Sequence, residues 1–390
     1  MFSEPEGTGE ERSGKPLSGI RVLDLTRLLP GPLCAQHLAD LGADVIKIED
    51  TGRGDYVRPA IRRLVNRNKR AIRLDLKQDE GRDLLLRLVR TADVFIESFR
   101  PGVADRLGVG YDALRAVQPR LVYGSISGYG QTGPYRLRPG HDLNYGGYTG
   151  VVDEVGRAGE APAMSGFLLS DLLGGTLSAA MGILAALVDA QRSGLGRHVD
   201  IAMTDSVFAH NVLALANLLE TGRAAERGKG SHSGGKARYG IYATADGRYI
   251  ALAAQEKQFW ERFCELVGRP DFKSRHDEAA LPESAFRKEM DALFAAQPLA
   301  FWCDLLEKEE TCASPVLTLE EALTDAHVQA RGLIYESATG PMLAFPIKMS
   351  RYTFTLDREP PAPGADTDEV LSELGIRTQE IAALRAAGVI

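Results

Sequence analysis

The chain has 390 residues, which is enough for a large hydrophobic core and for two domains. Its 44% hydrophobic and 25% charged residues are typical of a soluble globular protein. The formal net charge of −7 argues against a nucleic-acid partner or a membrane-surface partner, because proteins that bind either carry basic surfaces.

Cysteine usage and hydropathy indicate a cytoplasmic protein. The four cysteines are widely spaced, with no C-x-x-C pair and no histidine at metal-ligand spacing, so we expect reduced, mostly buried thiols and no metal site. No run of about 18 uncharged apolar residues and no signal-peptide core is present, so we expect no membrane span. Residues 1–16 are polar, charged and rich in glycine, which predicts a disordered tail.

A strand-helix-strand unit begins at Ile20. Residues 20–25 and 43–49 are predicted strands, and Pro30 opens a helix that runs to about Leu41. The acidic end of the second strand is typical of dinucleotide-binding proteins. The first turn, at 26–32, lacks the G-x-G-x-x-G pattern that lets a pyrophosphate approach a helix start, so a nicotinamide or flavin oxidoreductase is disfavoured.

Further strands are predicted at 70–76, 92–97, 121–127 and 196–203, with a helix at 79–91. This alternation predicts a parallel α/β sheet whose ligand crevice lies at the carboxyl ends of the strands. Six cationic residues flank the predicted strands: Arg67, Lys69, Arg70, Lys77, Arg100 and Arg106. A single one of them would be read as a solvated surface charge, but six together predict a site for a phosphorylated ligand.

Two segments carry residues suited to proton transfer near neutral pH. His141 lies in Pro-Gly-His-Asp-Leu-Asn-Tyr at 139–145, and Asp171 lies in Met-Ser-Gly-Phe-Leu-Leu-Ser-Asp-Leu-Leu-Gly-Gly at 164–175. Neighbouring glycines would let a ligand approach the backbone. Asp171 opens an apolar helix predicted at 170–191, which we expect to be buried. From the residues alone, a plain helix cap at Ser170 or Asp171 and a structural role for His141 remain open.

The second half of the chain has a different pattern. After a predicted helix at 205–219, residues 220–238 read as an exposed linker. Residues 239–254 predict a hairpin around Asp246-Gly247, and a helix opens at Gln255. Residues 285–331 are predicted to be helical and surface-like, 345–355 to run back toward the first domain, and the last twenty residues to form one helix. The expected organisation is a large domain at 17–219, a small domain at 239–332 and a return segment at 333–390.

Taken in order, these pieces resemble the family III CoA-transferases of the CaiB/BaiF type, which include the α-methylacyl-CoA racemases. The resemblance covers about 17–390 and is carried by Val-Leu-Asp-Leu-Thr at 22–26, Pro-Gly-Pro at 30–32, Leu-Gly-Ala-Asp-Val-Ile-Lys-Ile-Glu at 41–49, Asn-Lys-Arg at 68–70, Leu-Asp-Leu-Lys at 74–77, Ser-Phe-Arg-Pro-Gly at 98–102 and Asp-Arg-Leu-Gly at 105–108. It implies a Rossmann-like parallel α/β large domain and a smaller α+β domain in an interlocked homodimer.

The resemblance also implies an acyl-CoA thioester as the ligand, with coenzyme A as part of the substrate and no permanently bound cofactor. The acyl-CoA would lie between the large domain of one chain and the small domain of the other. The residues that match CoA-contacting positions are Leu28, Leu29, Pro30, Leu74, Asp75, Lys77, Ser98, Phe99, Arg100 and Arg106. Asp50 departs from the family, which commonly has a basic residue at this position.

Two chemistries share this family. In the transferases, the aspartate matching Asp171 attacks the thioester and forms a covalent aspartyl-CoA intermediate. In the racemases it is an acid/base that works opposite a histidine, and the position matching His141 is usually aromatic in transferases. Glu256 matches a racemase-like glutamate that could hold the imidazole. We therefore favour a racemase over a CoA-transferase, and a non-catalytic CoA-binding protein is disfavoured because all three acid/base candidates are present.

Enolate stabilisation and the acyl group are also predicted. Backbone N–H groups near Asp142 are candidate donors to the enolate oxygen. The acyl pocket is expected near 143–148 and 164–169, whose mostly apolar residues favour an aliphatic acyl group. Glu256 also has a plain alternative, that of an exposed first-turn glutamate favouring the helix dipole.

Overall fold

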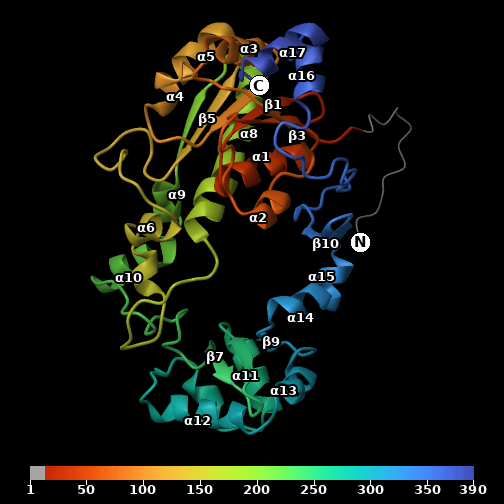
Figure 1. The fold of residues 1–390 in the computed structure, drawn as a ribbon. Helices are drawn as coiled ribbons and strands as arrows, with labels where there is room; N and C mark the ends of the chain where they lie inside the picture. The colour runs from red at the N-terminus through yellow and green to blue at the C-terminus, as the bar shows by residue number, and fades with distance from the viewer. Residues whose placement is uncertain (1–13) are drawn as a thin grey trace. The chain divides into compact units, whose positions relative to one another are not determined.

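The chain forms two compact units in the computed structural model, which describes residues 14–390 (Figure 1). The first unit comprises the described residues up to Gly146, Leu168–Ala209 and His327–Ile390, and the second comprises Gly147–Phe167 and His210–Ala326. The chain therefore leaves the first unit twice and returns to it twice. Residues 1–13 of the tail predicted at 1–16 lie outside the described residues.

A six-stranded parallel sheet forms the centre of the first unit, which confirms the predicted α/β class. The strand order is β3-β2-β1-β4-β5-β6, with Leu23 opposite both Ile46 and Phe95. The strands are β1 (Arg21–Leu25), β2 (Asp44–Glu49), β3 (Lys69–Arg73), β4 (Val94–Glu97), β5 (Val122–Ser127) and β6 (His198–Ala202). The order reverses between β1 and β4, and such a switch point opens a ligand crevice at the carboxyl ends of the strands.

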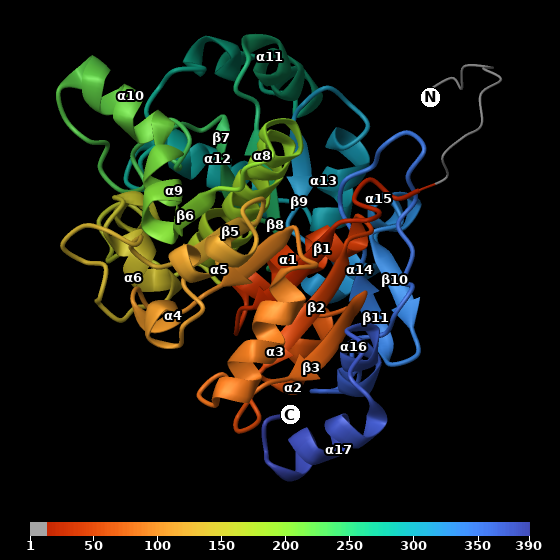
Figure 2. The same cartoon turned by 90° about the horizontal axis from the view of Figure 1, so that it is seen from above.

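Helices cover both faces of this sheet, because the side chains of each strand alternate between two apolar cores (Figures 1 and 2). Val22, Val45 and Val94 face α1 (Pro30–Asp40) and α8 (Ser178–Ser193). Leu23 and Ile46 face the opposite layer, which contains α3 (Asp79–Val89), α5 (Tyr111–Val117), α16 (Thr367–Glu373) and α17 (Thr378–Ala386).

The last twenty residues do not form the single helix that was predicted. α16 and α17 are separate, with Gly375 between them at φ 76°. Glycine adopts this left-handed backbone without steric cost and so ends the first helix. Val370 and Ile381, one from each helix, are both buried against the sheet.

The predicted helix at 170–191 differs from the expectation in two ways. It begins as a π-helix, η1 (Ser170–Leu177), and continues as α8. It was expected to be buried, but Leu177, Met181 and Val188 are 51%, 66% and 47% exposed, because only one face packs on the sheet. By length and composition alone, Ser170–Ser193 is also apolar enough to span a membrane, a test that core helices of soluble proteins pass as well.

The helix predicted at 205–219 is broken in the structure. It forms α9 (Met203–Ala209) in the first unit and α10 (Val212–Thr221) in the second. Asn211, between them, has the non-helical ψ of 47°. The remaining short elements of the first unit are α2 (Pro59–Leu64), α4 (Val103–Arg106), α6 (Asp142–Gly147) and the antiparallel pair β10 (Ile334–Ser337) and β11 (Gly340–Leu343).

The predicted hairpin is confirmed in the second unit. β7 (Tyr239–Ala243) and β8 (Tyr249–Ala253) pair antiparallel, and β9 (Ala313–Pro315) adds a third strand. The other elements outside the first unit's sheet layers are α7 (Val151–Glu154), α11 (Lys257–Leu266), η2 (Pro270–Arg275), α12 (Ala285–Ala295), α13 (Leu299–Leu306), α14 (Leu319–Thr324) and α15 (Ala326–Ala330).

Residues 285–331 are not surface-like throughout, as the sequence suggested. Phe286, Met290 and Phe294 recur every fourth residue on α12 and are fully buried with Trp302 of α13. This spacing places them on one helix face, which packs with the hairpin around Trp260. Because many charged residues lie between these apolar residues in the sequence, the composition of the segment suggested a surface helix.

Candidate active site

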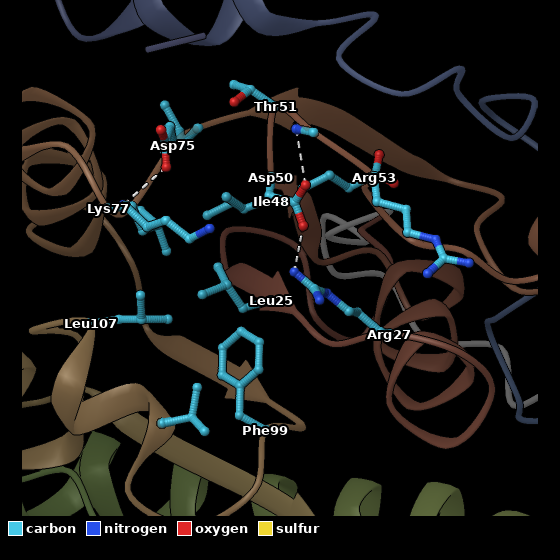
Figure 3. A pocket seen from close by; sticks show the side chains of 15 residues that line it. Leu25, Arg27, Ile48, Asp50, Thr51, Arg53, Asp75, Lys77, Phe99 and Leu107 are labelled. Carbon is cyan, nitrogen blue, oxygen red and sulfur yellow. Dashed lines mark hydrogen bonds and ion pairs between the residues drawn. The ribbon is translucent and has the colours of Figure 1, made fainter. Parts of the chain in front are cut away.

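A pocket of about 570 Å³ lies at the carboxyl ends of the first four strands in chain order (Figure 3). Leu25 ends β1, Ile48 approaches the end of β2, Leu74 follows β3 and Phe99 follows β4, and all four line the pocket. The volume falls in the range of ~300–1,000 Å³ that binds small ligands. The pocket therefore occupies the crevice that the strand order creates.

Charged residues surround this apolar lining. Arg27 Nη2 lies 2.6 Å from Asp50 Oδ2, while Asp50 Oδ1 accepts the N–H groups of Gly52 and Gly54, each at 3.0 Å. The Arg27 guanidinium also lies near the rings of Tyr56 and Phe99. Arg27 is therefore held in place, and much of its charge is neutralised by Asp50.

Lys77 and Arg53 are the cations of the pocket that form no ion pair within residues 14–390. Figure 3 shows the Lys77 side chain extending across the pocket, whereas Arg53 points away from it. An apolar slot with cations at its rim suits a ligand that has a flat ring system and phosphate groups.

The residues predicted to contact CoA divide into two groups. Leu74, Asp75, Lys77 and Phe99 line the pocket. Leu28, Leu29, Pro30, Ser98, Arg100 and Arg106 are not part of its lining, although two of them support it. The Ser98 hydroxyl accepts the Arg27 N–H at 3.0 Å, and Leu28, with φ at 69°, donates its N–H to Asp55.

Three of the six cations predicted to bind a phosphorylated ligand are instead structural. Arg67 makes a two-pronged contact with Asp40, with Nε–Oδ1 at 3.0 Å and Nη2–Oδ2 at 2.7 Å. Lys69 pairs with Asp24, and Arg70 pairs with Asp44. All three cations are at most 5% exposed. The ligand-binding prediction for them is therefore wrong, because carboxylates of the protein already pair with all three buried cations.

Tyr145 organises the segment that follows β5. Its hydroxyl donates to the Gly140 carbonyl, and its ring lies where side chains on Gly128 and Gly140 would be, with Cβ positions 2.2 and 2.7 Å from Cε1. Gly128 is also tied to the start of α9 through both the N–H and the hydroxyl of Thr204. These contacts fix the chain on either side of His141 at the carboxyl end of the sheet.

The structure brings His141 and Asp171 together in the first unit. The Asp171 N–H donates to Asp142 Oδ1 at 2.9 Å, so the residue next to His141 binds the main chain of Asp171. The His141 side chain is exposed, while its backbone carbonyl accepts the N–H groups of Asn144 and Tyr145. An exposed imidazole on a fixed backbone and a half-buried carboxyl group are side chains of the kinds that can move protons near neutral pH.

The electrostatics of Asp171 suit proton transfer near neutral pH. Burial, followed by the nearby negative charge of Asp142, raises the pKa of Asp171 to about 6, and His141 opposes the rise. The alternative of a plain helix cap is wrong, since Leu169 occupies the cap position and η1 has no side-chain cap hydrogen bond. A carboxyl group with its pKa near ambient pH is matched to general acid/base chemistry.

The glycines after Asp171 serve packing rather than the expected approach of a ligand. A Cβ on Gly174 would lie 2.6 Å from the Met203 carbonyl oxygen, and one on Gly175 would lie 2.6 Å from Pro30 Cβ. The Thr176 hydroxyl also donates to the Pro30 carbonyl at 2.9 Å. The helix that carries Asp171 is thus pressed against α9 and the start of α1.

Glu256 belongs to the second unit and is exposed. It is the N-cap residue of α11, with ψ at 144°, and its side chain makes no cap hydrogen bond. The helix was expected to open at Gln255 and begins two residues later, at Lys257, so Glu256 precedes the first turn rather than lying in it. Its predicted contact with His141 stays a prediction.

The sequence matches the model of CoA-transferase family III over residues 17–367. It is 35% identical to α-methylacyl-CoA racemase of Homo sapiens over 96% of this chain and 97% of that protein. It is also 35% identical to acetyl-CoA:oxalate CoA-transferase of Acetobacter aceti, over 90% of this chain and 93% of that one. A crystal structure of a CaiB/BaiF family protein from Brucella suis matches with a TM-score of 0.81 and 31% identity, covering 93% of this chain and all of that chain.

Proposed function

Because the chain belongs to CoA-transferase family III, we propose that it is an acyl-CoA racemase that inverts the carbon next to the thioester. The chain is an enzyme of this family, whose named relatives include racemases and CoA-transferases. Identity alone does not separate the two activities, since both kinds of relative match at about the same level. The pairing of His141 with Asp171, whose pKa is raised to about 6, is the observation that favours the racemase.

Racemisation removes a proton from one face of the α-carbon and returns one to the other face. In the proposed mechanism, Asp171 and His141 stand on opposite faces: one takes the proton as the C–H electron pair moves into an enolate, and the other donates its own proton to the carbon. Glu256 would hold the imidazole of His141. Each positioned acid/base group contributes ~10²–10⁴-fold to the rate.

The enolate oxygen also needs hydrogen-bond donors. In the described part of the chain, the N–H groups of Asp142 and Leu143 have no hydrogen-bond partner, whereas those of Asn144 and Tyr145 are bound to the His141 carbonyl. The Asp142 and Leu143 N–H groups are therefore the donors we assign to the thioester oxygen. They adjoin both proposed proton carriers, because Asp142 follows His141 and binds Asp171.

The 570 Å³ pocket would take the nucleotide of CoA, which is part of the substrate rather than a bound cofactor. Leu25, Ile48 and Phe99 offer apolar contacts for the base, and Lys77 offers a charge for the phosphates. The exposed side chains of Leu143 and Leu168 next to the proton carriers favour an aliphatic acyl group. The assembly we propose is an interlocked homodimer.

The second candidate is a CoA-transferase, which is supported by the transferase relatives. In that reaction the Asp171 carboxylate attacks the thioester carbonyl and releases CoA thiolate, which gives a mixed anhydride. The thiolate then attacks the Asp171 carbonyl of the anhydride, which releases the original acyl group as its carboxylate and leaves CoA on Asp171 as a thioester. That route does not involve the α-carbon and gives His141 no proton to move.

Incubation with a 2-methylacyl-CoA in deuterated water separates the two reactions. We expect deuterium at the α-carbon, with His141→Ala and Asp171→Ala each lowering the exchange rate at least ~100-fold. Asp205→Asn, which removes an exposed carboxylate from the neighbouring helix α9, is the matched control and should exchange like the parent. A hydroxylamine-sensitive CoA adduct at Asp171 without exchange, together with an unaffected His141→Ala variant, would establish the transferase instead.

A further inference from the structure

We propose that Asp142 is a positioning residue that fixes the main chain of Asp171 through its carboxylate and opposes the negative charge of Asp171. The part of this proposal that is tested by the α-exchange rate rests on the racemase function proposed above. The contact itself is independent of that function, since it joins two segments of the first unit that lie 29 residues apart in the chain.

Asp142 supplies a hydrogen-bond acceptor that the local sequence lacks. Helix η1 begins after Leu169, whose side chain cannot accept a hydrogen bond, and the helix has no side-chain cap of its own. Asp142 Oδ1 accepts the Asp171 N–H at 2.9 Å in its place. Because the acceptor is a carboxylate, this bond is of the stronger, charge-assisted kind. The start of the helix that presents Asp171 is therefore held from the segment that presents His141.

The surroundings of Asp171 leave Asp142 as the main like charge. After burial, the negative charge of Asp142 contributes most to raising the pKa of Asp171, and His141 acts in the opposite direction. Tyr145 also lies close, since burial and then the charge of Asp171 raise its pKa to about 12, with Arg100 opposing the rise. On the packed helix α9, the pKa of Asp205 responds to burial and to Asp200 rather than to Asp171.

This arrangement couples the two proposed proton carriers. His141 and Asp142 are adjacent, so a shift of their segment would move the imidazole and the start of η1 together. Misplacement of a catalytic group by about 1 Å can cost ~100-fold in rate. Asp142 would act on the reaction through Asp171 without having to exchange a proton with the substrate.

Two variants separate the hydrogen bond from the charge. Asp142→Asn keeps an oxygen that can accept the Asp171 N–H but removes the negative charge, whereas Asp142→Ala removes both. The first measurement is a ¹³C NMR titration of labelled aspartate carboxyl groups, with the Asp171 resonance identified by its loss in Asp171→Asn. We expect the parent midpoint near 6 and a midpoint lower by ~0.5–1 pH unit in both variants. An unchanged midpoint in Asp142→Asn would overturn the role of the charge.

The second measurement is the α-exchange rate on its high-pH plateau, where Asp171 is ionised in every variant. We expect the Asp142→Ala rate to fall ~10–100-fold below the Asp142→Asn rate, because only the Asn variant keeps an oxygen that can accept the Asp171 N–H. Equal plateau rates for the two variants would overturn the positioning role. Circular dichroism tests folding, and Asp142→Ser, whose shorter side chain places its oxygen away from the Asp171 N–H, replaces an Ala variant that does not fold.

The two measurements also separate this proposal from the proposed function. The NMR titration requires no turnover, so a parent protein without α-exchange would fail as a racemase while the effect of Asp142 on Asp171 is still measured. Asp205→Asn again serves as the control and should leave both the titration midpoint and the plateau rate at their parent values.

Discussion

The Lys69 ammonium lies 2.8 Å from the Asp24 carboxylate, and neither side chain is exposed to solvent. Asp24 also accepts the N–H of Thr26 at 2.9 Å, and the Thr26 carbonyl accepts a hydrogen bond from Lys47. The buried pair therefore supports the turn after β1, which places Arg27 at the rim of the pocket. Buried charges of this kind stabilise only as a matched set, because each one alone carries a large desolvation cost.

Replacing one member of this pair should be more damaging than replacing both. We expect Lys69→Met to lower the free energy of unfolding by ~3–5 kcal/mol, since it leaves the Asp24 carboxylate buried without its partner. The double variant Asp24→Asn/Lys69→Met should recover part of that loss. Urea denaturation of the single and double variants measures the difference.

An exposed ion pair provides the control for this measurement. Arg115 and Asp112 lie 3.0 Å apart on α5, with side chains 58% and 87% exposed. Arg115→Met should change the free energy of unfolding by less than ~1 kcal/mol, since solvent screens such pairs. A Lys69→Met variant as stable as Arg115→Met would show that the buried pair does not hold the turn.

Lys77 and Arg106 were both predicted to contact CoA, but their places relative to the pocket predict unequal effects of replacing them on CoA binding. Lys77→Ala should weaken CoA binding ~10–100-fold, because one charge-assisted contact contributes ~1.5–3 kcal/mol. Arg106 lies outside the pocket lining, so Arg106→Ala should have a smaller effect. Titration calorimetry with CoA measures both affinities, and Arg115→Ala is the control. Lys77→Ala binding CoA like the parent would move the nucleotide to another site.

Most strands of the six-stranded sheet could be predicted from the sequence because they carry short apolar runs with both faces buried, whereas β6 exposes His198 and Asp200. Leu23 and Val22, for example, point into separate cores, and such strands read as continuous hydrophobic segments. The helix break at Asn211 could not be predicted, since no glycine or proline interrupts the apolar pattern there. Nor does composition tell which units the helices on either side of it join.

Much of the candidate site depends on contacts between residues distant in sequence. His141 and Asp171 were predicted by residue type and family motif, but the hydrogen bond from Asp171 to Asp142 spans 29 residues and has no local signature. The same reason explains the error on Lys69, whose partner Asp24 lies 45 residues away. The sequence alone does not reveal whether a cationic side chain will be solvated, bind a ligand or pair with a buried carboxylate.

The raised pKa of Asp171 predicts a cost to stability that depends on pH. A carboxyl group has an ordinary pKa of 3.8, and in the folded protein that of Asp171 is about 6. The folded state therefore holds this proton more tightly than the unfolded chain, so the associated stability is complete below pH ~4 and is lost as the pH rises through about 6.

Asp171→Asn removes this titration while keeping the shape of the side chain. As the pH rises from 4 to 7.5, we expect the free energy of unfolding of the variant to increase relative to that of the parent by ~1–3 kcal/mol. One pKa unit corresponds to ~1.4 kcal/mol, and partial exposure reduces the effect. Urea denaturation at pH 4.5, 6 and 7.5 measures the trend. Asp205→Asn, which replaces an exposed carboxylate on α9, should show a smaller change with pH. If the difference in unfolding free energy between Asp171→Asn and the parent stays constant over this range, Asp171 titrates alike in the folded and unfolded states. That result would remove the electrostatic argument for its role in proton transfer.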